Sequence, residues 1–294
     1  MVQTWSRIIS LPLLAASVLT YALGAGIADY LGYSPDGWNY FIGQGIVLLI
    51  LASSKILFEY FEHLKKGVQP FSRRTPEDKA DNPSPQTLLI MAVVLLTFIV
   101  LLGYTLSRNV NNVGLMFLQL ALLILLSLLF IGQGRCVYSG YGELAQGLIL
   151  CCLIPTFAFS IQYGDVHRIL LLATFPLIFL FLAVRFALEL ESYDRDLKAN
   201  RFSLLIRLGW QRGVLFHHIF LILVFLLLAI ATLFGLAWRL VWPALLAMPL
   251  ALFEIWLINR IALGLPPRWF LVKVSAGITF SLPVYLLAIT FWLT

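Results

Sequence analysis

Apolar runs long enough to cross a bilayer recur along the whole chain, and this feature constrains the fold more than any other. A helix of about 20 apolar residues crosses a hydrocarbon core roughly 30 Å thick. Charged residues make up 12% of the 294 residues and hydrophobic residues 61%, whereas about a quarter of a soluble domain is charged. The sequence therefore predicts a polytopic α-helical membrane protein with a single integral membrane domain, residues 1–294.

Charged, proline-rich and glycine-rich stretches divide the chain into nine predicted spans. Arg7 precedes the first apolar run and no small-residue cleavage site follows it, so we expect a retained helix there. Gly24 and Gly26 in this run favour close packing against another helix. The predicted spans are residues 8–29, 38–58, 87–107, 111–131, 142–162, 168–190, 214–236, 240–259 and 271–293.

Lys and Arg are distributed unevenly between the two sets of loops. The loops after the first, third, fifth and seventh spans hold only Arg108, Arg168 and Arg239 of the 20 basic residues. Because basic loops stay on the cytoplasmic side, this predicts a cytoplasmic N-terminus and an outside C-terminus, with a bacterial plasma membrane as the expected location. The net charge of +6 does not indicate a nucleic-acid partner, since the bases lie in short loops beside apolar runs.

The predicted loop after the second span begins with an acidic cluster. Glu59, Glu62, His63 and Lys66 follow helical spacing, so their side chains share one face of a helix end. Further bases follow in the same loop: Lys65, Arg73 and Arg74.

The loop after the sixth span repeats this plan. Arg185, Glu189, Ser192 and Asp196 are spaced by 4, 3 and 4 residues, which again makes one helical stripe. Other acids, Glu191 and Asp194, point roughly the opposite way. Bases follow here too: Lys198, Arg201 and Arg207.

Acids followed by bases suit the binding of a diphosphate. Neighbouring carboxylates repel each other unless a cation lies between them, and oxygen-rich clusters favour Mg²⁺. Lys and Arg then neutralise the remaining phosphate charge. The candidate catalytic acids are Glu59, Glu62, Glu189 and Asp196, and the candidate metal ligands are these four with Asp194. The candidate diphosphate-binding bases are Lys65, Arg73, Arg74, Lys198 and Arg201.

This layout resembles the UbiA superfamily of intramembrane prenyltransferases, and most of all its dihydroxynaphthoate polyprenyltransferase branch. That family has nine helices and acidic motifs after helices 2 and 6. Its second motif, approximately N-x-x-D-x-E-x-D-x-x-x-G-K-x-T-L-x-x-x-L-G, is matched here by Glu189, Ser192, Asp194, Asp196, Asn200, Arg201, Ser203, Leu204, Leu208 and Gly209. Its first motif, N-D-x-x-D, corresponds to Phe58, Glu59 and Glu62. The branch's Y-S…G-E-L segment resembles Tyr138-Ser139-Gly140 and Gly142-Glu143-Leu144.

The chain departs from the family motifs at several of the acidic and amide positions. Phe58 replaces the family's Asn, and Glu59 and Glu62 replace aspartates with side chains one methylene longer. Ser192 replaces the leading Asp of the second motif, although Glu189 lies one turn earlier on the same face. These changes alter the reach of the ligands while keeping carboxylates in both motifs.

The resemblance implies a nine-helix bundle around a central cavity that opens to the cytoplasmic side. It implies that Mg²⁺ held by the acids of the two motifs binds a polyprenyl diphosphate and stabilises the departing diphosphate. A small electron-rich acceptor would then attack the allylic cation, giving C-prenylation as in lipid or quinone biosynthesis.

Two other hypotheses are open at this point. The segment Glu59-x-x-Glu62-His63 is half of a di-iron pattern, but the second cluster has no His to complete it. A transporter or a non-catalytic lipid-binding member of the same fold is the other alternative. Transporters place ionisable groups near the membrane midplane, whereas most acids here lie at one membrane face.

Ionisable residues also occur inside or at the edges of the spans, where they are costly unless paired or functional. Glu143 lies at a predicted helix start, where a carboxylate is stabilised by the helix dipole, so capping and a functional role are both open. We expect Glu254 to pair with an Arg such as Arg260. His217 and His218 open the seventh span and are expected at the membrane interface.

Overall fold

The computed structural model describes residues 11–68, 84–132, 141–198 and 203–294, and within these ranges every regular element is a helix. Nine helical segments of the described chain are long and apolar enough to cross a membrane. They are Leu11–Tyr30, Gly37–Phe61, Pro85–Ser107, Val113–Phe130, Gly142–Tyr163, Arg168–Leu190, Trp210–Leu233, Trp238–Ala262 and Trp269–Leu293. The predicted nine spans are confirmed, with boundaries that differ by at most four residues where both ends are described.

The spans are built from the following helices. The first four use α2 (Leu11–Tyr30), α3 (Gly37–Val68), α4 (Pro85–Ser107) and α5 (Val113–Leu126) with the π-helix η2 (Ser127–Gly132). The fifth combines α7 (Gly142–Leu148), η3 (Ile149–Leu153) and α8 (Ile154–Tyr163). The last four are α9 (Arg168–Leu190), α12 (Trp210–Leu233), α13 (Trp238–Leu245) with α14 (Met248–Ala262), and α15 (Trp269–Leu293).

Local sequence signals fix where the helices begin and end. The Ser84 hydroxyl accepts a hydrogen bond from the Thr87 amide, and Pro85 follows at the first helical position, so α4 begins there. The Asn112 side chain caps α5 in the same way through the Leu115 amide. Gly209 has a φ of 81°, which a residue with a Cβ rarely adopts, and it separates the short helix α11 (Leu204–Leu208) from α12.

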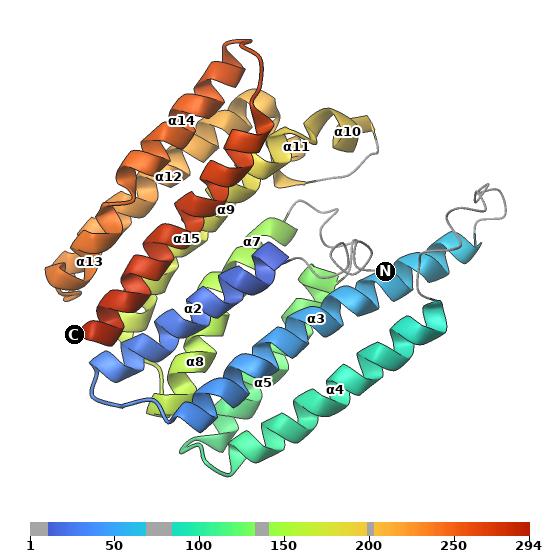
Figure 1. Ribbon diagram of the computed structural model, residues 1–294, viewed down its shortest axis with the longest axis vertical. Coiled ribbons are helices and arrows are strands. Elements are labelled where there is room, and N and C mark those ends of the chain that lie inside the picture. Colours follow the sequence, from blue (N-terminus) through green and yellow to red (C-terminus); the bar gives the residue numbers. More distant parts are fainter. Residues whose placement is uncertain (1–10, 69–83, 133–140, 199–202) are drawn as a thin grey trace.

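The spans pack as one bundle, with α2, α15 and α9 in its middle. Helix α2 packs against α15 and α8, α3 against α4, and α9 against α12. Figure 1 shows α12, α13 and α14 on one flank and α3, α4 and α5 on the other. On the α4 flank many large apolar side chains are exposed, including Ile90, Phe98 and Val100, as expected of a surface that faces lipid.

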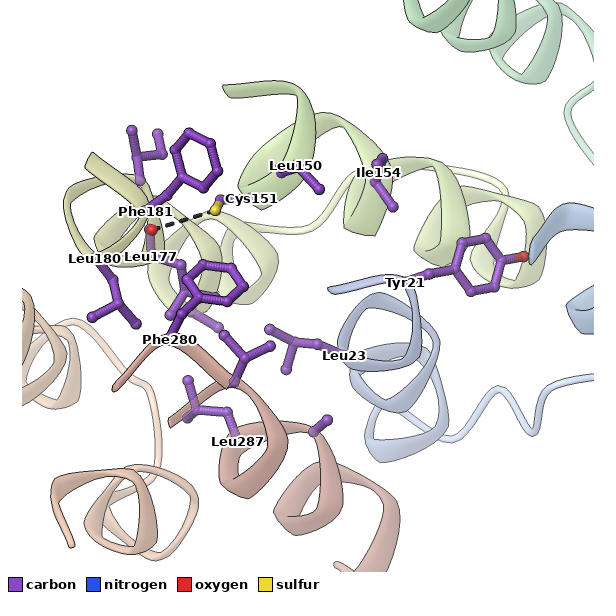
Figure 2. Packing of buried hydrophobic residues seen from close by; sticks show 14 of the residues in the cluster. Tyr21, Leu23, Leu150, Cys151, Ile154, Leu177, Leu180, Phe181, Phe280 and Leu287 are labelled. Carbon is purple, nitrogen blue, oxygen red and sulfur yellow. Dashed lines mark hydrogen bonds between the residues drawn. The ribbon is translucent and has the colours of Figure 1, made fainter. Parts of the chain in front are cut away.

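Close helix contacts account for the tight centre of the bundle. A Cβ on Gly24 would collide with the backbone of Pro155 in α8, so only glycine permits this approach of α2 to α8. The close packing predicted for Gly24 is therefore confirmed. Figure 2 shows the neighbouring core, where the Cys151 thiol donates to the Leu177 carbonyl at 3.3 Å and joins η3 to α9.

Both acidic helix ends lie on one side of the molecule. Helices α3 and α9 end there, α7 begins there, and the short helix α10 (Tyr193–Lys198) lies beside them. We call this side the α10 face. Figure 1 shows the short connections between the other ends of the spans, such as residues 31–36 and 164–167, on the opposite side.

Candidate functional site

An arginine–glutamate pair lies at the end of α9. The Nη2 atom of Arg185 is 2.6 Å from Oε1 of Glu189, one turn further along the helix. The Glu189 side chain is 13% exposed and the Arg185 side chain 34%. Their spacing of four residues brings them together on one helical face, as the sequence predicts. The second oxygen of Glu189 is buried and has no hydrogen-bond partner.

A second carboxylate faces this pair from α7. Glu143 stands in the first turn of α7, and its residue is only 1% exposed. Helix α7 packs against α9, and the negative charges of Glu143 and Glu189 interact. The Oε2 atom of Glu143 is buried without a hydrogen-bond partner. Because a buried carboxylate is costly unless its environment compensates it, Glu143 is a candidate residue of this site.

Helix α3 contributes a base and an acid. Lys55 is partly buried in the second span, and its positive charge is repelled by that of Arg185 on α9. One turn later, Oε1 of Glu59 lies 3.7 Å from Nε2 of His63. Lys55 and Glu59 are four residues apart and share one face of α3. Three helices therefore bring charged groups together at the α10 face.

The segment after α9 closes the site. The Ser192 hydroxyl donates to Oδ2 of Asp196 at 2.6 Å, which confirms that the two share a stripe although α9 ends at Leu190. Glu191 turns away and pairs with Lys273 of α15 at 2.6 Å. The Ser203 hydroxyl caps α11 by accepting a hydrogen bond from the Ile206 amide.

Some of the residues predicted from the sequence lie at the site, some are exposed, and others lie outside the described part of the structure. Glu189 lies in the last turn of α9 as expected, whereas α3 continues past Glu59 to Val68. Asp196 follows on α10. Asp194 and Lys198 are exposed on α10. The backbones of Glu62 and Lys65 belong to α3, but their side chains lie outside the described part of the structure, as do residues Arg73, Arg74 and Arg201 entirely.

The site predicted from the sequence omits Lys55, leaves Glu143 open between capping and a functional role, and includes Arg185 only as part of a stripe. Their signal in the sequence is an ionisable side chain inside an apolar run, which is costly in a membrane and is usually functional. Lys55 is such a residue in the second span. The sequence could not show which of the nine helices it faces.

The described residues do not form a magnesium site. No group of three or more His, Cys, Asp or Glu side chains among them is arranged to hold a metal. One carboxylate oxygen of Glu189 is already engaged by Arg185, and one of Glu59 lies near His63. Mg²⁺ requires near-octahedral oxygen ligands, and in these two acids a base competes for one of the oxygens.

A second buried ionisable pair lies deeper in the bundle. His217 of α12 and Glu254 of α14 are both completely buried, with Nε2 and Oε1 3.3 Å apart. The expected pairing of Glu254 with Arg260 is therefore wrong, because the Arg260 guanidinium lies over the Trp256 ring instead. The sequence did not predict that the His217 ring is enclosed between two spans.

The chain is similar in structure to solved UbiA homologues. One from Archaeoglobus fulgidus, bound to GPP and Mg²⁺, has a TM-score of 0.68 at 13% identity, covering 99% of this chain and 100% of that one. An apo homologue from Aeropyrum pernix K1 has a TM-score of 0.64 at 12% identity, covering 92% and 96%. Digeranylgeranylglyceryl phosphate synthase has a TM-score of 0.61 at 12% identity, covering 99% and 97%.

No protein-family model matches the sequence, and no curated protein matches it. The similarity is therefore structural. Over nearly the whole chain, the arrangement of the helices is similar to that of the UbiA homologues. The fold implied by the sequence motifs is confirmed.

Proposed function

We propose that this protein transfers a prenyl group from a prenyl diphosphate to an electron-rich acceptor within the membrane. The observation that carries the proposal is the convergence of α3, α7 and α9 at the α10 face, where they gather buried acids and bases. A UbiA homologue with a similar arrangement of helices is bound to GPP and Mg²⁺, which supports a prenyl diphosphate as the substrate.

In the proposed reaction the diphosphate binds near Lys55 and Arg185. Further bases of the two loops would complete its binding: Lys65, Arg73, Arg74, Lys198 and Arg201. Lys and Arg donate charge-assisted hydrogen bonds to phosphate oxygens and stabilise the negative charge that develops as the diphosphate leaves. The prenyl tail would extend between the apolar spans, in the predicted central cavity.

The chemical step breaks the allylic carbon–oxygen bond, and the bonding electron pair leaves with the diphosphate. The resulting allylic cation forms a carbon–carbon bond with the acceptor, which then loses one proton. Glu143 is our candidate to accept that proton, because its Oε2 is buried and has no hydrogen-bond partner. A phenolic or naphthoic acceptor, as in quinone biosynthesis, has the electron-rich carbon that this step requires.

The support for Mg²⁺ in this proposal is the homologue that is bound to GPP and Mg²⁺. Among the described acids, Glu189 and Glu59 have basic neighbours, so we assign no step to Mg²⁺ here. Of the other predicted ligands, Glu62 has a side chain outside the described structure, and Asp194 is exposed on α10.

The test uses the full-length protein in nanodiscs with a labelled geranyl, farnesyl or geranylgeranyl diphosphate, Mg²⁺ and a panel of phenolic acceptors. We expect acceptor-dependent release of diphosphate together with a prenylated product. Arg108, which is exposed on the opposite side near the loop after α4, provides the control variant Arg108→Met. Absence of diphosphate release with every acceptor, together with absence of diphosphate binding, would overturn the proposal.

A lipid-binding protein of the same fold without catalysis is the second candidate. The observation that favours it is the pairing of Glu189 with Arg185, which leaves this acid partly neutralised. It predicts tight binding of a prenyl diphosphate without any release of diphosphate in the same assay.

We also propose that the α10 face is cytoplasmic, so that the N-terminus lies inside and Thr294 outside. The basis is the distribution of Lys and Arg among the loops. A reporter that is active only outside the bacterial plasma membrane should be active when it is fused after Thr294, and a reporter that is active only in the cytoplasm should be inactive there.

A further inference from the structure

Two fixed positive charges lie among the acids of the proposed site. Arg185 contacts Glu189 on α9, and the positive charges of Arg185 and of Lys55 on α3 repel each other. Together with Glu59 and Glu143, these side chains form a group of five that we call the charged cluster. Arg185 contacts one of its three carboxylates, Glu189, whereas Lys55 forms no ion pair with a described carboxylate.

The donors of Arg185 are only partly used. A guanidinium has five N–H donors, and one nitrogen, Nη2, hydrogen-bonds to Glu189. Its Nε is buried and has no hydrogen-bond partner. Arg185 can therefore donate to a phosphate oxygen while it keeps its contact with Glu189.

Lys55 is a second available donor. Its ammonium has three N–H donors, and within the described residues no ion pair joins it to a carboxylate. A partly buried lysine in a membrane span is costly unless an anion compensates it. The carboxylate of Glu59, one turn further along α3, is near His63 instead. The positive charge of Lys55 thus calls for an anionic ligand.

We infer that Lys55 and Arg185 are built-in counter-ions for the diphosphate and supply part of the charge neutralisation that metal ions provide in oxygen-only sites. This inference rests on the proposed function and goes beyond it, because it concerns how the diphosphate is held. Where a carboxylate cluster must recruit Mg²⁺ before it can accept a diphosphate, the charged cluster already contains cations. Binding of a prenyl diphosphate should therefore depend only weakly on Mg²⁺.

The test measures binding in place of turnover. The dissociation constant of geranyl thiodiphosphate, which resists cleavage, is determined by calorimetry with the full-length protein in nanodiscs, in excess EDTA and in excess Mg²⁺. We expect the two values for the unsubstituted protein to agree within about tenfold, a difference of about 1.4 kcal/mol. We expect Lys55→Met to weaken binding in EDTA by about tenfold or more, as for a lost charge-assisted contact.

Two further variants keep the result interpretable. Arg185→Met alone leaves Glu189 unpaired and can destabilise the fold, so it is combined with Glu189→Gln, which removes that charge. The double variant should also bind weakly in EDTA, and Arg108→Met should bind like the unsubstituted protein.

The outcomes separate this inference from the proposed function. Binding that occurs only with Mg²⁺, and that Lys55→Met leaves unchanged, overturns the inference and leaves the proposed prenyl transfer standing. Absence of binding in both EDTA and Mg²⁺ contradicts both. Binding in EDTA that is lost in Lys55→Met and kept in Arg108→Met supports the role of the built-in cations.

Discussion

Arg185 holds Glu189 at 2.6 Å across one turn of α9, at the point where that span reaches the α10 face. This contact determines the character of the site. It offsets the charge of a largely buried acid, whose negative charge also interacts with that of the buried Glu143. The same helix end therefore presents both signs of charge.

The first prediction concerns the stability that this pair provides. Arg185→Met should lower the free energy of unfolding by about 1–3 kcal/mol, because Glu189 is left without its base in a largely buried position. Thermal unfolding in detergent measures the effect. Adding Glu189→Gln should recover most of the loss, and equal stability of Arg185→Met and the unsubstituted protein would contradict a structural contribution of the pair.

The second prediction concerns Glu143. Because Glu143→Gln keeps the shape but removes the proton acceptor, turnover should fall by about a hundredfold, with little change in the affinity for geranyl thiodiphosphate. A parallel loss of affinity would assign Glu143 to substrate binding. Retention of full turnover would show that the acceptor loses its proton elsewhere.

The third prediction concerns the close approach of α2 and α8. Gly24→Ala should destabilise the protein by about 1–3 kcal/mol, since the new methyl group meets the Pro155 backbone. Gly277→Ala in α15 is the matched control, because a Cβ there meets no atom within 4 Å. Comparable unfolding temperatures for the two variants would show that the helices can separate at no cost.

The fourth prediction concerns His217 and Glu254. Either Glu254→Leu or His217→Leu alone leaves one completely buried polar partner unpaired, so each should cost about 1–3 kcal/mol. The double variant should cost less than the sum of the two, and this non-additivity reports the contact. Strict additivity would mean that the two side chains do not interact in the membrane.

Much of the fold follows from the sequence because one physical rule dominates it. Apolar runs must cross the bilayer as helices, and Ser84, Asn112 and Gly209 mark ends that local capping and backbone geometry dictate. The contacts within one helix were also predictable, as Arg185 and Glu189 show, because four-residue spacing fixes them.

The contacts between helices were not predictable in the same way. The partner of Glu254 is His217 on another span, and the sequence alone favoured Arg260, which is six residues away. Lys55 and Glu143 belong to the site because of how α3 and α7 are rotated against α9. That rotation depends on packing details such as the contact at Gly24, which a hydropathy pattern does not contain.

The most direct test of the whole account is a structure of the protein in nanodiscs with geranyl thiodiphosphate bound. The account predicts the diphosphate between α3, α7 and α9, with phosphate oxygens within hydrogen-bonding distance of Lys55 and Arg185 and the geranyl chain among the spans. A diphosphate bound away from these helix ends, with Lys55 and Arg185 untouched, would contradict it.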